Sequence, residues 1–262
     1  MEAAQPPAQP PAGSPPAPAG RQLEIGAVLG ETFSIYGKNL GPLLGVAIAL
    51  YLAIAIIAGL GFAASGFLGL ILFAVLAVVG VTLYGGFVVR LVEDVRDGRR
   101  DSSVGELIQS AMPAVPALIG NGILKGLAVA VGLVLLIVPG LILLTIWAVT
   151  GPAIVVERRG VIDAFSRSWE LVRGQAWAVF AIILLTFLIT QGVTYLLGAV
   201  GDGIGDTVGY MIFQAIAGAL TAPIGGLVAA ILFFDLGGGQ GAAAAAPAAP
   251  AQPPPPPAAP TA

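Results

Sequence analysis

The sequence predicts an all-α integral membrane protein with six transmembrane helices, because it is strongly apolar, contains six long apolar stretches and gathers its basic residues between alternate stretches. Hydrophobic residues make up 57% of the 262 residues and charged residues only 10%, and the mean hydropathy is +0.96. Soluble domains carry about 25% charged residues. A chain this apolar cannot cover itself with polar surface in water, so we expect it to fold in a lipid bilayer.

The two ends of the chain differ in composition from its centre. Residues 1–20 and 237–262 consist mainly of Pro, Ala, Gly and Gln. Such segments cannot bury enough apolar surface to offset the entropy of ordering, so both are predicted to be disordered tails around a membrane domain of residues 21–236. No basic-then-apolar pattern precedes residue 41, so no cleaved leader is expected and the first span would direct insertion.

Six apolar stretches are long enough to cross the hydrocarbon core, which takes about 17–25 residues in a helix. Five of them contain no charged residue, and the third is interrupted only by Asn121 and Lys125. Taken together they account for most of the chain between the tails. The stretches are Gly41–Phe62, Phe67–Val89, Ala117–Val138, Gly140–Val156, Ala176–Val200 and Thr207–Phe234.

The long segment 117–156 forms either one helix or a hairpin of two. One continuous helix would be about 60 Å long, roughly twice the thickness of the hydrocarbon core. We therefore predict that the chain turns at Pro139-Gly140. The basic residues support this turn, since all Lys and Arg of the connections then fall on one side of the membrane.

The loops that contain Lys and Arg determine which side of the membrane is expected to be cytoplasmic. Lys and Arg mark cytoplasmic loops, so both termini are expected in the cytoplasm. The chain has nine Arg and two Lys, and it is rich in Ala, Gly, Val and Pro, a composition typical of GC-rich bacterial genomes. The expected location is therefore the plasma membrane of a bacterial cell, where the chain would be a multi-pass protein.

Each pair of apolar stretches follows a short segment with helical periodicity. These segments align at Leu29, Leu107 and Phe165, and the second begins with the capping-box pattern from Ser103 to Glu106. Helices that are apolar on one side and polar on the other lie in the membrane interface. The predicted architecture is therefore three repeats of an interfacial amphipathic helix plus a helical hairpin.

A recurring pattern extends from the Pro-Gly step through the third short segment. It consists of a Pro-Gly turn, an apolar helix ending in Pro-Ala and an acidic residue, and then Gly, Ala, Arg-Ser and Leu before a Gly-aromatic step. The residues that carry it are Pro139-Gly140, Pro152-Ala153, Glu157, Gly160, Ala164, Arg167-Ser168, Leu171, Gly174 and Trp177.

Together with the segment Leu29–Leu40, this pattern resembles a known prokaryotic group. The group is the multi-pass membrane domain associated with glycerophosphoryl diester phosphodiesterases, together with related uncharacterised six-span membrane proteins. The resemblance covers about residues 22–236 and implies a membrane domain without an assigned role. Because no hydrolase domain follows and the chain has no His, the resemblance does not imply phosphodiesterase activity.

Four arginines and two tryptophans surround the third short segment. Basic residues near an anionic leaflet contribute about 1 kcal/mol each, and tryptophans favour the lipid–water interface. We expect these residues to recognise anionic lipids or a partner protein, and the alternative is that they only set the topology and anchor the segment. They are Arg158, Arg159, Arg167, Arg173, Trp169 and Trp177.

Three polar residues are predicted within or at the ends of spans. Lys125 and Asn121 lie inside the third stretch, and Glu157 lies at the cytoplasmic end of the fourth. Lys125 either extends its amine to the interface or pairs with another group inside the membrane, for which Glu157 is the expected partner. If Lys125 stays inside the membrane, its functional interpretation is contact with a substrate.

Two patterns concern the packing of the helices. Gly122, Gly126 and Ala130 form a face of small residues, which predicts a close helix contact. Pro223, followed by two glycines, predicts a kink in the last span.

The composition excludes several classes of function. The chain has no Cys and no His, which removes thiol catalysis, imidazole acid–base chemistry and the usual metal and haem ligands, so no cofactor is expected. A net charge of −3 does not favour nucleic acid. We expect a non-enzymatic protein that organises or regulates lipids or partner proteins, with a membrane protein or a second copy of the chain as partner. The alternative is a transporter or permease for a small or amphiphilic solute, which Lys125 and Pro223 would serve.

Overall fold

The computed structural model describes residues 23–98, 102–203 and 207–239, and the predicted tails up to residue 20 and from residue 240 lie outside this part of the chain. Within it, every regular element is a helix. The helices are α1 (Ile25–Lys38), α2 (Leu40–Ala64), α3 (Gly66–Arg96), α4 (Val104–Ala111), a short 3-10 helix (Met112–Ala114), α5 (Val115–Leu135), α6 (Ile137–Ile146), α7 (Thr150–Glu157), α8 (Val161–Val172), α9 (Ala176–Gly203) and α10 (Thr207–Asp235).

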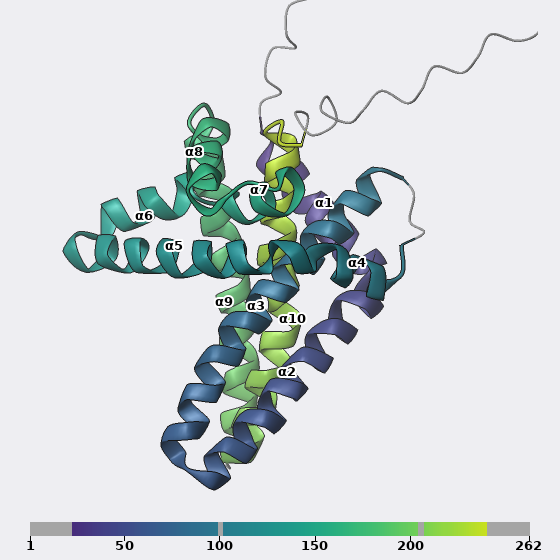
Figure 1. Ribbon diagram of the computed structural model, residues 1–262, viewed down its shortest axis with the longest axis vertical. Helices are drawn as coiled ribbons and strands as arrows, with labels where there is room; N and C mark the ends of the chain where they lie inside the picture. Colours follow the sequence, from purple (N-terminus) through teal and green to yellow (C-terminus); the bar gives the residue numbers. More distant parts are fainter. Residues whose placement is uncertain (1–22, 99–101, 204–206, 240–262) are drawn as a thin grey trace, which may run out of the picture.

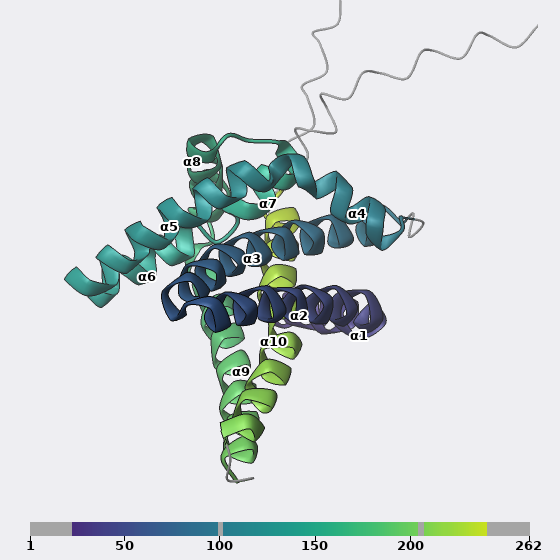
Figure 2. The same ribbon diagram turned by 60° about the horizontal axis from the view of Figure 1, so that its bottom comes forward.

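Three long hairpins diverge from a common centre (Figures 1 and 2). The hairpins are α2–α3, α5–α6 and α9–α10, and each points in a different direction. The short helices α1, α4, α7 and α8 gather with the C-terminal ends of α3 and α10 where the hairpins meet, and we call this region the hub. Among the described residues, six helical segments are long and apolar enough to cross a membrane, which confirms the predicted helical membrane class and the number of spans.

A short helix precedes each hairpin, as the sequence predicts. These helices are α1, α4 and α8. The capping box at the start of α4 is confirmed, because the Ser103 hydroxyl accepts from the Glu106 N–H at 3.3 Å and the Glu106 carboxylate accepts from the Ser103 N–H at 2.7 Å. The threefold repeat of the units stays a prediction.

Two of the hairpins turn at a single extended residue. Ser65 joins α2 to α3 with φ −164° and ψ 129°, and Leu136 joins α5 to α6 with φ −158° and ψ 131°. The predicted turn at Pro139-Gly140 is therefore wrong by a few residues, since both lie inside α6. Pro139 falls in the first turn of that helix, where a backbone N–H has no helical partner and its absence costs little.

Two backbone hydrogen bonds frame the first turn. The Ser65 N–H donates to the Gly61 carbonyl at 2.9 Å, and the Gly69 N–H donates to the Ser65 carbonyl at 2.9 Å. The second turn repeats the first bond, from the Leu136 N–H to the Gly132 carbonyl at 3.0 Å. In both hairpins a glycine therefore lies four residues before the turn residue.

Glycine also lies four residues after each turn residue, where the two helices touch. A Cβ on Gly69 would lie 2.5 Å from the backbone N of Phe62, and a Cβ on Gly140 would lie 2.7 Å from the backbone N of Leu133. Only hydrogen fits at these positions, so the glycines set how closely the paired helices approach. By contrast, a Cβ on Gly122 would meet nothing within 4 Å, so the predicted small-residue contact on α5 is wrong.

The fourth span is interrupted. Helix α6 ends at Ile146 and α7 begins at Thr150, so the predicted stretch Gly140–Val156 forms two helices with a break between them. Such breaks free backbone groups that need partners inside a membrane.

Pro223 lies inside α10, where it lacks the N–H that the carbonyl four residues earlier would accept. The neighbouring carbonyl of Leu220 accepts a hydrogen bond from the Tyr36 hydroxyl of α1 at 3.1 Å. Burial raises the pKa of Tyr36, so this phenol stays protonated at neutral pH and remains a donor. The proline thus coincides with a bond that ties α1 to α10, and the kink itself stays a prediction.

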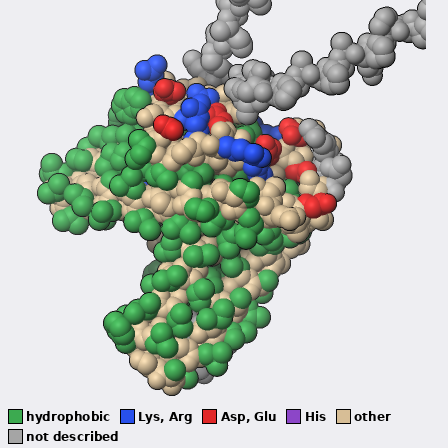
Figure 3. Space-filling model, in the orientation of Figure 1, with side chains coloured by type: hydrophobic (Ala, Val, Ile, Leu, Met, Phe, Trp, Pro, Cys, Tyr) green, Lys and Arg blue, Asp and Glu red, His purple; other side chains and the backbone are tan. Residues whose placement is uncertain are grey.

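The core of the protein sits in the hub, and the hairpins expose their apolar side chains. Phe87, Ile154, Leu227 and Phe233 are among the fully buried side chains. Hydrophobic side chains cover the two hairpins visible in Figure 3, whereas Lys, Arg, Asp and Glu gather at the hub. This distribution suits hairpins surrounded by lipid and a hub in contact with water and headgroups.

Candidate functional site

Arg96 at the end of α3 ties three helices of the hub together. Its guanidinium donates to both carboxylate oxygens of Glu31 in α1, at 3.0 and 2.9 Å, and to Asp235 in α10 at 2.8 Å. It also lies 5.4 Å from the ring centre of Phe234. A two-pronged bond between Arg and a carboxylate fixes geometry as well as charge, so this residue stabilises the hub and is not a free cation.

Glu157 at the end of α7 is the centre of a second polar cluster. Its side chain is 6% exposed, and its oxygens accept from Arg167 at 2.9 to 3.1 Å and from Arg159 at 3.1 Å. The backbone N–H of Gly239 donates to it as well, at 3.1 Å. The expected pair with Lys125 is therefore wrong. The hydrogen bonds to Glu157 also raise the pKa of Arg167, so the pair stays ionised.

A surface that combines cations with large apolar side chains surrounds α8. Arg158, Arg159 and Arg173 are exposed beside the exposed apolar residues Ile162 and Trp169. Trp177 at the start of α9 is 84% exposed. We call these six residues the α8 surface.

Arg167 departs from the prediction that it faces lipid. It lies half-buried between Glu157 and, at 3.6 Å, Glu170. Of the four arginines predicted at the interface, three are therefore exposed, and one of these, Arg159, also donates to Glu157 at 3.1 Å. Arg167 is held inside the hub.

The break between α6 and α7 is satisfied by side chains from two other helices. The Lys125 amine of α5 donates to the Trp147 carbonyl at 2.6 Å. The Ser168 hydroxyl of α8 donates to the Ile146 carbonyl at 2.8 Å and accepts from the Val149 N–H at 3.3 Å. These bonds supply hydrogen-bond partners for the backbone groups that the break leaves unpaired. The sequence offered Ser168 only as part of a family pattern, without this role.

Asn121 lies one helical turn before Lys125 and is buried. Its carbonyl oxygen accepts from the Thr150 hydroxyl at 3.0 Å, which adds a bond between α5 and α7. Its amide nitrogen has no hydrogen-bond partner among the residues that the structure describes. Both polar residues predicted inside the third stretch therefore turn toward the α6–α7 break.

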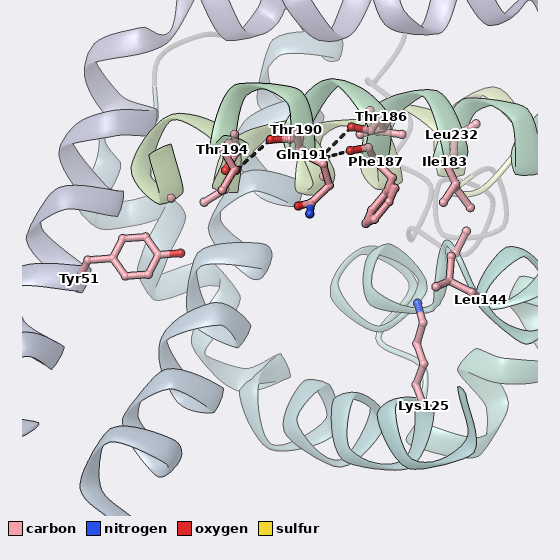
Figure 4. A pocket seen from close by; sticks show the side chains of 17 residues that line it. Tyr51, Lys125, Leu144, Ile183, Thr186, Phe187, Thr190, Gln191, Thr194 and Leu232 are labelled. Atoms are coloured by element: carbon pink, nitrogen blue, oxygen red, sulfur yellow. Dashed lines mark hydrogen bonds between the residues drawn. The ribbon is translucent and has the colours of Figure 1, made fainter. Parts of the chain in front are cut away.

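A groove of about 470 Å³ adjoins this break, between α9 and α10 on one side and α2 and the α5–α6 hairpin on the other. Figure 4 shows the Lys125 amine, the Gln191 amide of α9 and the Tyr51 hydroxyl of α2 projecting toward the same space. Ile183, Phe187 and Val228 supply apolar surface along it. A cation, amide and hydroxyl donors and apolar walls therefore meet in one intramembrane groove.

Three threonines one turn apart line the groove along α9. Thr186, Thr190 and Thr194 each donate to the carbonyl four residues earlier in their own helix, at 2.7, 3.0 and 2.9 Å. Their hydroxyl protons are thus engaged, and they present methyl groups and acceptor oxygens. Among the described residues, no three His, Cys, Asp or Glu side chains are placed to hold a metal ion.

Comparison with known proteins identifies one match to a family. The family model described as Domain of unknown function (DUF7847) matches residues 62–234, from the end of α2 to the last turn of α10. No curated protein and no solved structure matches the chain significantly.

Proposed function

The chain belongs to the family described as Domain of unknown function (DUF7847), and on this premise we propose that it is a non-enzymatic multi-pass membrane protein that organises anionic lipids at one surface of the bilayer. The observation that carries the proposal is the α8 surface, where exposed Arg158, Arg159 and Arg173 lie beside exposed Trp169 and Trp177. Cations attract anionic headgroups, and tryptophans hold a helix at the lipid–water interface. That the protein is not an enzyme rests on a sequence without Cys or His.

We further propose that the hub faces the cytoplasm of a bacterial cell and that the tip of the α2–α3 hairpin reaches the opposite side of its plasma membrane. The gathering of Lys and Arg at the hub supports this orientation. The start of α1 and Gly239, which bonds to Glu157, lie at the hub, so in this orientation both ends of the described chain would face the cytoplasm.

The orientation predicts opposite labelling of two exposed serines. Ser65 lies at the α2–α3 tip and Ser102 beside the start of α4 in the hub, and the chain has no cysteine of its own. In intact cells, an impermeant maleimide should label Ser65→Cys and should leave Ser102→Cys unlabelled until the membrane is permeabilised. Labelling of Ser102→Cys from outside would reverse the topology.

Neutralising the α8 surface should weaken the binding of acidic lipids. The triple variant Arg158→Gln, Arg159→Gln, Arg173→Gln should lower the apparent affinity for phosphatidylglycerol at least about tenfold, because each arginine contributes about 1 kcal/mol. Native mass spectrometry from mixed micelles measures the lipids retained. As a matched control, Asp163→Asn with Glu170→Gln removes exposed negative charge from the same helix and should raise retention. Equal retention by all three proteins would contradict the proposal.

The groove beside Lys125 supports a second candidate function, transport of a small or amphiphilic solute. Polar groups inside a membrane commonly mark a substrate path. In that case the purified protein in liposomes should move solute, and Lys125→Ala should abolish the movement. A protein that binds lipid but moves no solute would leave only the first proposal.

A further inference from the structure

We infer that the groove that α9 and α10 form with α2 and the α5–α6 hairpin binds a single anionic lipid, with its phosphate or carboxylate beside Lys125 and an acyl chain along α9. This inference rests on the proposed lipid-binding function and assigns it a second site, separate from the α8 surface. Four observations carry it: the position of Lys125, its partners, the lining of the groove and the openness of its side.

Lys125 places an ammonium group deep in the membrane. It lies at the midpoint of α5 (Val115–Leu135), and its partner is the neutral carbonyl of Trp147. Among the described residues, no carboxylate lies within salt-bridge distance of it. A cation away from water is costly unless an anion compensates it.

The bond to Trp147 uses only part of the hydrogen-bonding capacity of the Lys125 amine. An ammonium group has three donor hydrogens, so two remain for other acceptors after one goes to the carbonyl. The negative end of α6 offsets part of the charge, because this carbonyl directly follows the last residue of that helix. A phosphate or carboxylate in the groove would accept the remaining hydrogen bonds of the amine and neutralise its positive charge.

The lining beyond the amine suits an alkyl chain. Ile183, Phe187 and Val228 are apolar, and the threonines of α9 have engaged their hydroxyl protons within the helix. From Ile183 to Thr194 the helix runs for about 16 Å. Gln191 and Tyr51 offer donors along this path, which suit the ester or hydroxyl oxygens of a glycerolipid.

The groove is accessible from the bilayer and not only from water. Phe187 is 56% exposed and Tyr51 39% exposed, and both residues line the groove. A volume of about 470 Å³ lies within the range of about 300–1,000 Å³ in which proteins hold small ligands. The groove therefore has room for the acidic group and part of one alkyl chain, while the remainder of a lipid stays in the membrane.

Binding of defined lipids to the purified full chain tests the site. The probes are phosphatidic acid and oleic acid, which share an acidic group on an alkyl chain, phosphatidylcholine as a zwitterionic lipid, and inorganic phosphate as the free anion. The wild-type protein should bind both acidic lipids, phosphatidylcholine much more weakly, and inorganic phosphate not at all. Binding of phosphate in competition with the lipids would identify a small-anion site and overturn the lipid assignment.

Substitutions at two positions test the charge of Lys125 and the open volume of the groove separately. Lys125→Met should lower the affinity for acidic lipids at least about tenfold, the loss expected for a charged hydrogen bond, and Lys125→Arg should retain most of it. Gly218→Leu should block the groove while leaving the amine in place, because a Cβ at Gly218 meets nothing within 4 Å and this residue lines the groove. Gly192→Leu on α9, equally free of contacts and exposed, is the matched control and should change nothing.

The outcomes distinguish the groove from the α8 surface. If Lys125→Met and Gly218→Leu bind phosphatidic acid like the wild type, the groove assignment fails even when the triple arginine variant has lost lipid. If the triple variant retains all its phosphatidylglycerol while the two groove variants lose phosphatidic acid, the proposal for the α8 surface fails and the groove stands. Because Gly218→Leu leaves the Lys125–Trp147 bond intact, the groove can be tested even if Lys125→Met does not fold.

Discussion

Replacing Glu157 with Gln should lower the free energy of unfolding by about 3 kcal/mol, the cost of breaking a buried ion pair from one side. The carboxylate is 6% exposed and joins Arg167, Arg159 and the backbone of Gly239. Without that charge, the half-buried guanidinium of Arg167 faces a neutral amide at position 157 and keeps the longer ion pair with Glu170 at 3.6 Å. Reversible unfolding of the purified protein in mixed detergent micelles measures the change.

Glu170→Gln is the matched control, because Glu170 is the other carboxylate beside Arg167 but is 59% exposed. Exposed pairs contribute about 0–1 kcal/mol, so this variant should unfold almost like the wild type. A double variant, Glu157→Leu with Arg167→Leu, should recover part of the loss, since it leaves no buried charge unpaired. Equal effects of Glu157→Gln and Glu170→Gln would show that the cluster does not hold the hub.

Replacing Gly140 with Ala should destabilise the protein by about 1–3 kcal/mol, the usual cost of forcing an extra methyl into a close contact. The new Cβ would lie 2.7 Å from the backbone N of Leu133, so helices α5 and α6 must move apart. Their separation is set by backbone contact, which cannot relax by a rotamer change. The same unfolding experiment reports the loss.

Gly126→Ala, in the same hairpin, should act in the opposite direction. A Cβ at Gly126 meets nothing within 4 Å, and Ala is favoured over Gly inside a helix by about 0.5–1 kcal/mol. The two substitutions add the same methyl group to the same pair of helices, so opposite signs are the diagnostic result. Stabilisation by both would mean that α5 and α6 do not meet at Gly140.

The sequence predicts the parts of this fold that depend on local composition. Apolar length identifies the six spans, helical periodicity identifies the short helices before the hairpins, and the Ser103–Glu106 pattern identifies the start of α4. These features follow from the chemistry of a few neighbouring residues, so one sequence suffices to find them.

Features that depend on contacts between distant segments cannot be predicted from this sequence alone. Pro139 and Gly140 suggest a turn, yet a proline is compatible with the first turn of a helix, and the glycine serves a helix contact four residues past the true turn at Leu136. Glycine spacing likewise pointed to Gly126, because it does not tell which face of a helix meets a neighbour.

The polar partners of the candidate site show the same limit. The sequence predicts Glu157 as the partner of Lys125 inside the membrane, and this pair is wrong. The amine bonds to the Trp147 carbonyl at a helix break that apolar composition does not reveal. Arg167 looked equivalent to Arg158 and Arg173 in sequence, and only the position of Glu157 separates it from them. Burial and pairing of charges are properties of the assembled hub.

The turns at Ser65 and Leu136 bear on how a newly made chain enters the bilayer. Each joins two helices through one residue, and the N–H of that residue is already bonded to a carbonyl of the preceding helix. Such a tip carries no charged side chain, and its unpaired polar groups are the backbone N–H and C=O groups of the two helix ends. We therefore expect α2 with α3, and α5 with α6, to cross as closed pairs. The cost of crossing then comes from the backbone groups of the helix ends and not from a hydrated loop, because apolar side chains enter lipid favourably.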